Sequence, residues 1–160
     1  MAMYQRVLLA YDGSREGRTA LREGALAAKQ FGAQVFLLCV VADSPGVRIG
    51  EAAYPAALAL AQDTYVALFD EAMTRLRELG FDAQGRVVIG EPAPEIAAYA
   101  REVEADLVVV GHQRKGLWQR WWSGQTGSYL SDHLACSLLI ARTAVSDEVF
   151  YGALATPAAG

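Results

Sequence analysis

The chain of 160 residues lacks the residues and motifs that mark several common protein classes. It has only two cysteines, Cys39 and Cys136, and no C-x-x-C pair, so neither a disulfide framework nor a thiol redox site is predicted. Its two histidines, His112 and His133, stand far apart without spaced companion ligands, so no metal site is expected. No G-x-S-x-G elbow is present, although a Ser-His-Asp arrangement built from distant segments stays open.

Long apolar runs and a surplus of positive charge are also absent. No apolar segment reaches the ~18 residues that a membrane helix needs. The opening stretch MAMYQRVLLAYDG has a short apolar run and lacks the cleavage site of a signal peptide, so we expect a cytoplasmic protein without a membrane partner. The net charge of −4 disfavours a nucleic-acid partner. Hydrophobic residues make up 53% of the chain, which is enough for the core of one domain.

Apolar, strand-like runs alternate with amphipathic stretches along the chain. Strands are predicted at residues 5–11, 34–41, 85–89, 106–110 and 137–141. Helices are predicted between them, at residues 14–31, 57–79, 94–104 and 124–134, the first two ending at Gly32 and Gly80. Near-continuous apolar strands that alternate with helices are typical of an α/β protein whose parallel sheet is covered by helices on both faces.

Two segments stand outside this alternation. Residues 43–56 are rich in Gly, Pro and Ala and are predicted to form a loop. Residues 145–160 are predicted to form a C-terminal tail after a single domain at 1–144, with mobile last residues. The apolar part of that tail, Val149-Phe150-Tyr151, has two open interpretations, packing on the domain or on a partner.

Ligand sites of open parallel sheets lie at the carboxyl ends of the strands. The loop that follows the fourth predicted strand is the richest in glycine, with glycines at 111, 116, 124 and 127. Such a loop can hold phosphate, because its backbone amides and the next helix N-terminus, near Gln125 and Thr126, favour an anion. The loop matches neither the P-loop nor the dinucleotide fingerprint. A phosphate site and an ordinary surface loop therefore both stay open.

Two further features near these loops have more than one interpretation. The group Trp118, Trp121 and Trp122 is interpreted as loop packing, as part of a subunit interface, or as a base-stacking platform, which the acidic charge balance disfavours. Asp12, after the first strand, is either a turn former or a polar contact to a nucleotide.

Four segments together resemble the universal stress protein family over nearly all of the first 142 residues. They are residues 11–14 (YDGS), Gly90-x-Pro92 followed by Ile96, residues 105–112 (ADLVVVGH) and the apolar closing segment 130–140. The resemblance implies a doubly wound, five-stranded parallel sheet with the strand order 3-2-1-4-5. It also implies a homodimer formed through the last strand, at residues 137–142.

Nucleotide-binding members of that family carry a G-x-x-G pattern, then nine residues, then G-[ST]. In this chain Gly111 and Gly124 occupy the first and third glycine positions, whereas Arg114 replaces the second glycine. Gln125 stands where Ser or Thr is expected, and Thr126 follows it. Arginine adds bulk close to the phosphate position, but its guanidinium can itself pair with phosphate.

By this resemblance, adenine would lie beside the ends of the first two strands, near Tyr11, Asp12, Val40 and Val41. The phosphates would lie near the glycine-rich loop, at Gly111, Arg114, Gly124, Gln125 and Thr126. The implied function is a stress-response module that binds ATP or AMP without efficient catalysis. Two alternatives stay open: a nucleotide-free protein that acts through protein–protein interaction, and a weak ATP hydrolase.

Overall fold

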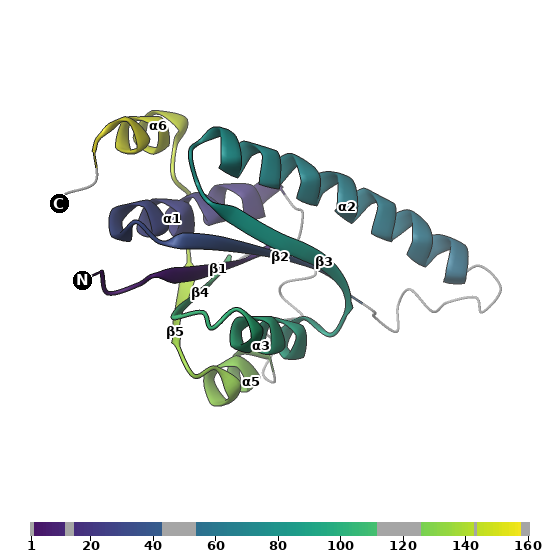
Figure 1. The fold of residues 1–160 in the computed structure, drawn as a ribbon. Coiled ribbons are helices and arrows are strands. Elements are labelled where there is room, and N and C mark those ends of the chain that lie inside the picture. The colour runs from purple at the N-terminus through teal and green to yellow at the C-terminus, as the bar shows by residue number, and fades with distance from the viewer. Residues whose placement is uncertain (1, 12–14, 43–53, 112–125, 143, 158–160) are drawn as a thin grey trace.

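The centre of the molecule is a five-stranded parallel sheet with the order β3-β2-β1-β4-β5 (Figure 1). The structure is a computed structural model that describes residues 2–11, 15–42, 54–111, 126–142 and 144–157. Its strands are β1 (Arg6–Tyr11), β2 (Gln34–Ala42), β3 (Ala83–Gly90), β4 (Leu107–Gly111) and β5 (Ser137–Ala141). This topology confirms the α/β fold class and the predicted strand order.

Helices follow each of the strands. They are α1 (Arg15–Phe31), α2 (Tyr54–Glu78), α3 (Pro92–Glu102), α5 (Thr126–His133) and α6 (Asp147–Ala155). After α1 and α2 the chain turns at Gly32 and Gly80, with φ of 62° and 89°, a conformation that glycine adopts without strain. Helix α2 begins earlier than predicted and takes up the end of the expected 43–56 loop, because Pro55 is tolerated in a first turn.

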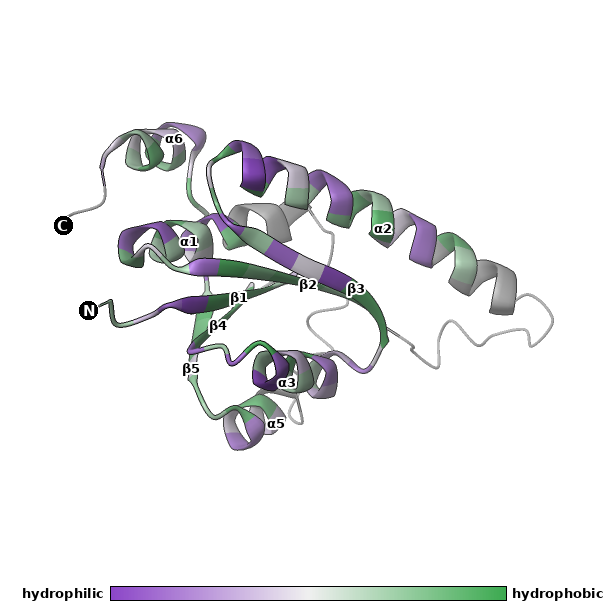
Figure 2. Cartoon of the chain, viewed as in Figure 1, coloured by the Kyte–Doolittle hydropathy of each residue, from purple (hydrophilic) through white to green (hydrophobic). Residues whose placement is uncertain are grey.

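The two faces of the sheet bury separate apolar clusters, as the period of two along a strand requires. In β1, Val7, Leu9 and Tyr11 pack toward the helices α1, α2 and α6, whereas Leu8 and Ala10 pack toward α3 and α5. Figure 1 shows these two helical layers on opposite sides of the sheet. Burial on both faces requires strands that are hydrophobic throughout. Figure 2 shows that β1 and β2 are hydrophobic along most of their length.

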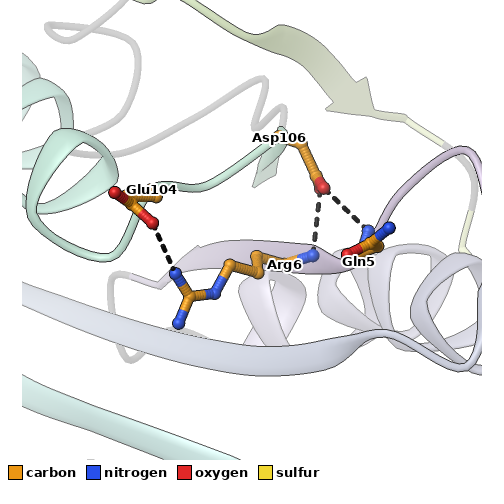
Figure 3. A network of polar contacts seen from close by, with 4 residues as sticks. All are labelled: Gln5, Arg6, Glu104 and Asp106. Atoms are coloured by element: carbon orange, nitrogen blue, oxygen red, sulfur yellow. Dashed lines mark hydrogen bonds and ion pairs between the residues drawn. The ribbon is translucent and has the colours of Figure 1, made fainter.

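A polar network joins β1 to β4 at the amino edge of the sheet (Figure 3). The Asp106 carboxylate accepts hydrogen bonds from the backbone N–H of Gln5 at 2.7 Å and of Arg6 at 3.0 Å. The Arg6 guanidinium also pairs with Glu104 at 3.1 Å. Because Asp106 directly precedes β4, this network holds the first residues of the two central strands in register.

The C-terminal segment, predicted as a tail, contains the helix α6. Ser146 caps it, since its hydroxyl accepts a hydrogen bond from the Val149 N–H at 3.3 Å. Phe150 is 5% exposed and packs in the cluster beneath α1, whereas Val149 and Tyr151 are exposed. Phe150 therefore packs on the domain, which is one of the two interpretations of this apolar stretch that the sequence left open.

Arg22 of α1 makes the polar connection to this C-terminal segment. Its Nη2 lies 2.5 Å from Asp147 Oδ1, and its Nη1 donates to the Val145 carbonyl at 2.9 Å. The guanidinium carbon also lies 5.1 Å from the centre of the Phe150 ring. Lys29, two turns further along α1, donates to the Leu154 carbonyl. Helix α6 is thus held along most of its length by α1.

Candidate functional site

The candidate site lies at the carboxyl edge of the sheet, between the neighbouring strands β1 and β4. After β1 the chain continues into α1 on one face, and after β4 it continues to α5 on the other face (Figure 1). The chain therefore diverges at this point, which is where open α/β sheets bind ligands. Helix α1 begins four residues after β1, at Arg15, and α5 is the next described helix after β4, beginning at Thr126. A helix N-terminus favours negative charge.

Strand β2 extends beyond β1 at the same edge. Tyr11, the last residue of β1, pairs with Cys39, so Val40, Val41 and Ala42 continue past it. At ~3.3 Å per residue these three residues make a step of ~10 Å beside the switch point. Val40 and Val41 in this step are apolar, and at 1% and 2% exposed they are covered.

Five of the residues named from the sequence are described and belong to this one edge: Tyr11, Val40, Val41, Gly111 and Thr126. Gly111 ends β4 and Thr126 begins α5. The ring of Tyr11 is 2% exposed and packs in the core cluster on the α1 side, so it does not stand open at the edge.

The other four site residues, Asp12, Arg114, Gly124 and Gln125, lie outside the described residues, as do His112 and the three tryptophans. The part of the glycine-rich loop that would distinguish a phosphate site from an ordinary loop therefore lies among them.

Comparison with known proteins gives one consistent result. The model of the universal stress protein family matches residues 3–142. The chain belongs to the universal stress protein family.

A curated universal stress protein from Synechocystis is 30% identical over 153 residues, covering 87% of this chain and 98% of the relative. The solved universal stress protein UspA from Lactobacillus plantarum is 27% identical, with a TM-score of 0.69, and the match covers 89% of this chain and all of that one (100%). A solved universal stress protein in complex with cAMP shares the fold at 24% identity, with a TM-score of 0.55, covering 89% and 98% of the two chains.

One cavity of this universal stress protein lies between α3 and the end of α5. It is a cavity of ≈ 270 Å³ lined in part by Cys136 and His133. Burial, with a smaller contribution from the nearby Asp106 carboxylate, raises the pKa of the Cys136 thiol above its ordinary value. The thiol is therefore protonated at neutral pH and a weak nucleophile. His133 stacks on the Tyr129 ring, with 3.8 Å between the ring centres.

Among the described residues, no group of three or more His, Cys, Asp or Glu side chains is placed to hold a metal ion. In the same part of the chain, no helix is both long enough and apolar enough to cross a membrane.

Sequence reasoning missed the contribution of α6 to another cavity, on the α1 side of the sheet. Phe150 and Tyr151 of α6 line this cavity together with residues of α1 and α2. One signal was present, because Ser146 followed by Asp147 and Glu148 is a typical helix start with acidic residues in the first turn. The position of α6 over α1 depends on tertiary contacts that no local pattern contains.

Proposed function

We propose that this universal stress protein is a cytoplasmic, dimeric stress-response module that binds an adenine nucleotide, ATP or AMP, without efficient catalysis. The nucleotide would lie at the carboxyl edge, between β1 and β4. Adenine would pack beside the step formed by Val40 and Val41, and the phosphates would lie between Gly111 and the start of α5.

The observation that carries this proposal is the chain divergence between β1 and β4, where the chain continues to α1 on one face of the sheet and to α5 on the other. An anion at that place interacts favourably with the partial positive charge of helix N-termini, at Arg15 and Thr126. The apolar step formed by β2 complements the flat, apolar faces of an adenine ring. The solved relative that holds cAMP adds support, because it shares this fold.

The test is calorimetric titration of the purified protein with ATP and AMP. We expect binding by the wild type and its loss in Gly124→Val, because the added side chain would stand where the loop approaches phosphate. Gly152→Val is the matched control, since a Cβ at position 152 meets no atom within 4 Å and lies in α6, away from the edge.

Three results would distinguish the alternatives. Absence of heat with millimolar nucleotide would overturn the proposal in favour of a nucleotide-free protein that acts through protein partners. Equal binding by the wild type and Gly124→Val would mean that the phosphates do not lie against the glycine-rich loop. If the wild type hydrolysed ATP and Asp12→Ala abolished this activity, the protein would be an ATP hydrolase and not only a binding module.

We propose that dimerisation uses residues 137–142, because β5 is an edge strand whose backbone is open to pairing. Ile140 on this strand is 37% exposed, and Ile89 on β3, the opposite edge, is 38% exposed. These two isoleucines form a matched pair for a sedimentation experiment. Ile140→Lys should convert the dimer to a monomer, whereas Ile89→Lys should leave it dimeric. A wild type that sediments as a monomer would refute this interface.

A further inference from the structure

A cavity of ≈ 220 Å³ lies on the α1 side of the sheet, beneath α2 and α6. Its described walls are largely apolar. Leu9 and Leu37 come from β1 and β2, and Leu68 and Leu76 come from α2. Phe150 of α6 closes it from the C-terminal side. Figure 1 shows α1, α2 and α6 on this one face of the sheet.

The wall that α6 supplies lies beyond the segment that matches the family. The family model ends at residue 142, and α6 begins at Asp147. The contacts of Arg22 with Asp147 and Val145 hold this wall in place. One wall of the cavity therefore comes from a part of this chain that lies outside the match to the family model.

The charges around the cavity indicate the sign of a ligand. Three charged side chains contribute to its lining: Arg22, Glu71 and Arg75. Arg22 is paired with Asp147, and Glu71 has an interaction of its own. No hydrogen bond or ion pair of the Arg75 side chain is found within the described residues. The Arg75 guanidinium can therefore pair with an anion at the rim of this apolar cavity.

We propose that this cavity binds a small amphipathic anion, with its apolar body between α1, α2 and α6 and its carboxylate paired with Arg75. The volume is below the ~300–1,000 Å³ of typical pockets for drug-sized ligands, which favours a single short chain or ring. Guanidinium is suited to the planar, two-oxygen shape of a carboxylate. Tyr11 is shared with the carboxyl edge, but Val40, Val41, Gly111 and the start of α5 do not line this cavity, so its ligand is distinct from the proposed nucleotide.

The test is calorimetric titration of the full chain with octanoate and with octanol, which has the same apolar body but no charge. We expect octanoate to bind and octanol to bind more weakly. Arg75→Gln should weaken octanoate about fivefold, a modest factor because Arg75 is exposed, and should leave octanol unchanged. Arg77→Gln is the matched control, since Arg77 lies on the same helix but does not line the cavity.

A second variant tests the location. Ala72 lines the cavity, so Ala72→Phe should fill the space and abolish binding of both molecules. Leu68→Trp provides a second filling variant if the first fails to fold, as judged by circular dichroism. Absence of octanoate binding in the millimolar range would overturn the proposal. Unchanged binding in a folded filling variant would overturn it, as would octanol that binds as tightly as octanoate.

Discussion

Gly24 of α1 lies against Leu9 of β1 so closely that no Cβ atom fits between them. An ideal Cβ at position 24 would lie 2.6 Å from Leu9 Cδ2 and 2.9 Å from Val109 Cγ1. Leu9 and Val109 belong to β1 and β4, the two strands that border the switch point. The glycine therefore sets how closely α1 approaches the part of the sheet that carries the candidate site.

Gly24→Ala should lower the free energy of unfolding by about 1 kcal/mol. Overpacking in a core costs ~1–3 kcal/mol, and the better helix propensity of alanine returns ~1 kcal/mol. Gly152→Ala is the matched control in another helix, where a Cβ meets no atom within 4 Å. It should raise the stability by ~0.5–1 kcal/mol. Urea unfolding of both variants measures the difference, and equal stabilisation by the two alanines would contradict the close contact at Gly24.

Asp106→Ala should destabilise the protein by about 2 kcal/mol, because it removes two charge-assisted hydrogen bonds to the backbone of β1. The matched control is Glu104→Gln, which breaks only the exposed ion pair with Arg6 and should cost ~0.2–1 kcal/mol. Thermal and urea unfolding provide the measurement. If the two variants lost equal stability, the network at the amino edge would not hold β1 and β4 through the Asp106 carboxylate.

The phenol of Tyr99 gives the stability a dependence on alkaline pH. Its ring packs edge-on to Phe36, with 6.4 Å between ring centres, and lies under the Arg86 guanidinium, 4.3 Å away. Burial raises the pKa of Tyr99 above 10.0, the nearby Glu102 raises it further, and Arg86 partly opposes this shift. The folded state thus retains a proton that the unfolded chain has lost.

This difference in proton binding makes stability fall as pH rises above about 10, through the pKa of the folded state. Below that pH the contribution is fully present. Tyr99→Phe removes the titrating group, so its stability should decline less steeply than that of the wild type between about pH 9 and 11. Urea unfolding at several pH values measures both slopes. Parallel curves for the two proteins would show that Tyr99 does not titrate differently in the folded and unfolded chains.

The sequence predicts the inner strands β1, β2 and β4 well because these strands are buried on both faces. Val7 to Tyr11 in β1 and Leu107 to Val110 in β4 read as unbroken apolar runs, and glycines follow the ends of α1 and α2. The sequence also predicts that the ligand lies at the carboxyl edge. This prediction needs only the strand order, which places Tyr11 and Gly111 at the ends of neighbouring strands. The cavity beneath α6 was not predictable, because it results from the packing of α6 with α1 and α2, and α6 begins more than a hundred residues after the end of α1.

Phe150→Ala should release α6 without unfolding the sheet. A fully buried Phe→Ala change costs ~3–5 kcal/mol, but a terminal helix can detach locally, which limits the loss of global stability. Native-state hydrogen exchange measures this, because the backbone amides of α6 should exchange roughly 10–100 times faster while those of β1 and β4 stay protected. Val149→Ala is the matched control, since Val149 lies on the same helix and is 58% exposed. Unchanged exchange in α6 after Phe150→Ala would mean that the contacts of Arg22 and Lys29 hold the helix alone. Faster exchange throughout the sheet would mean that α6 is an integral part of the core.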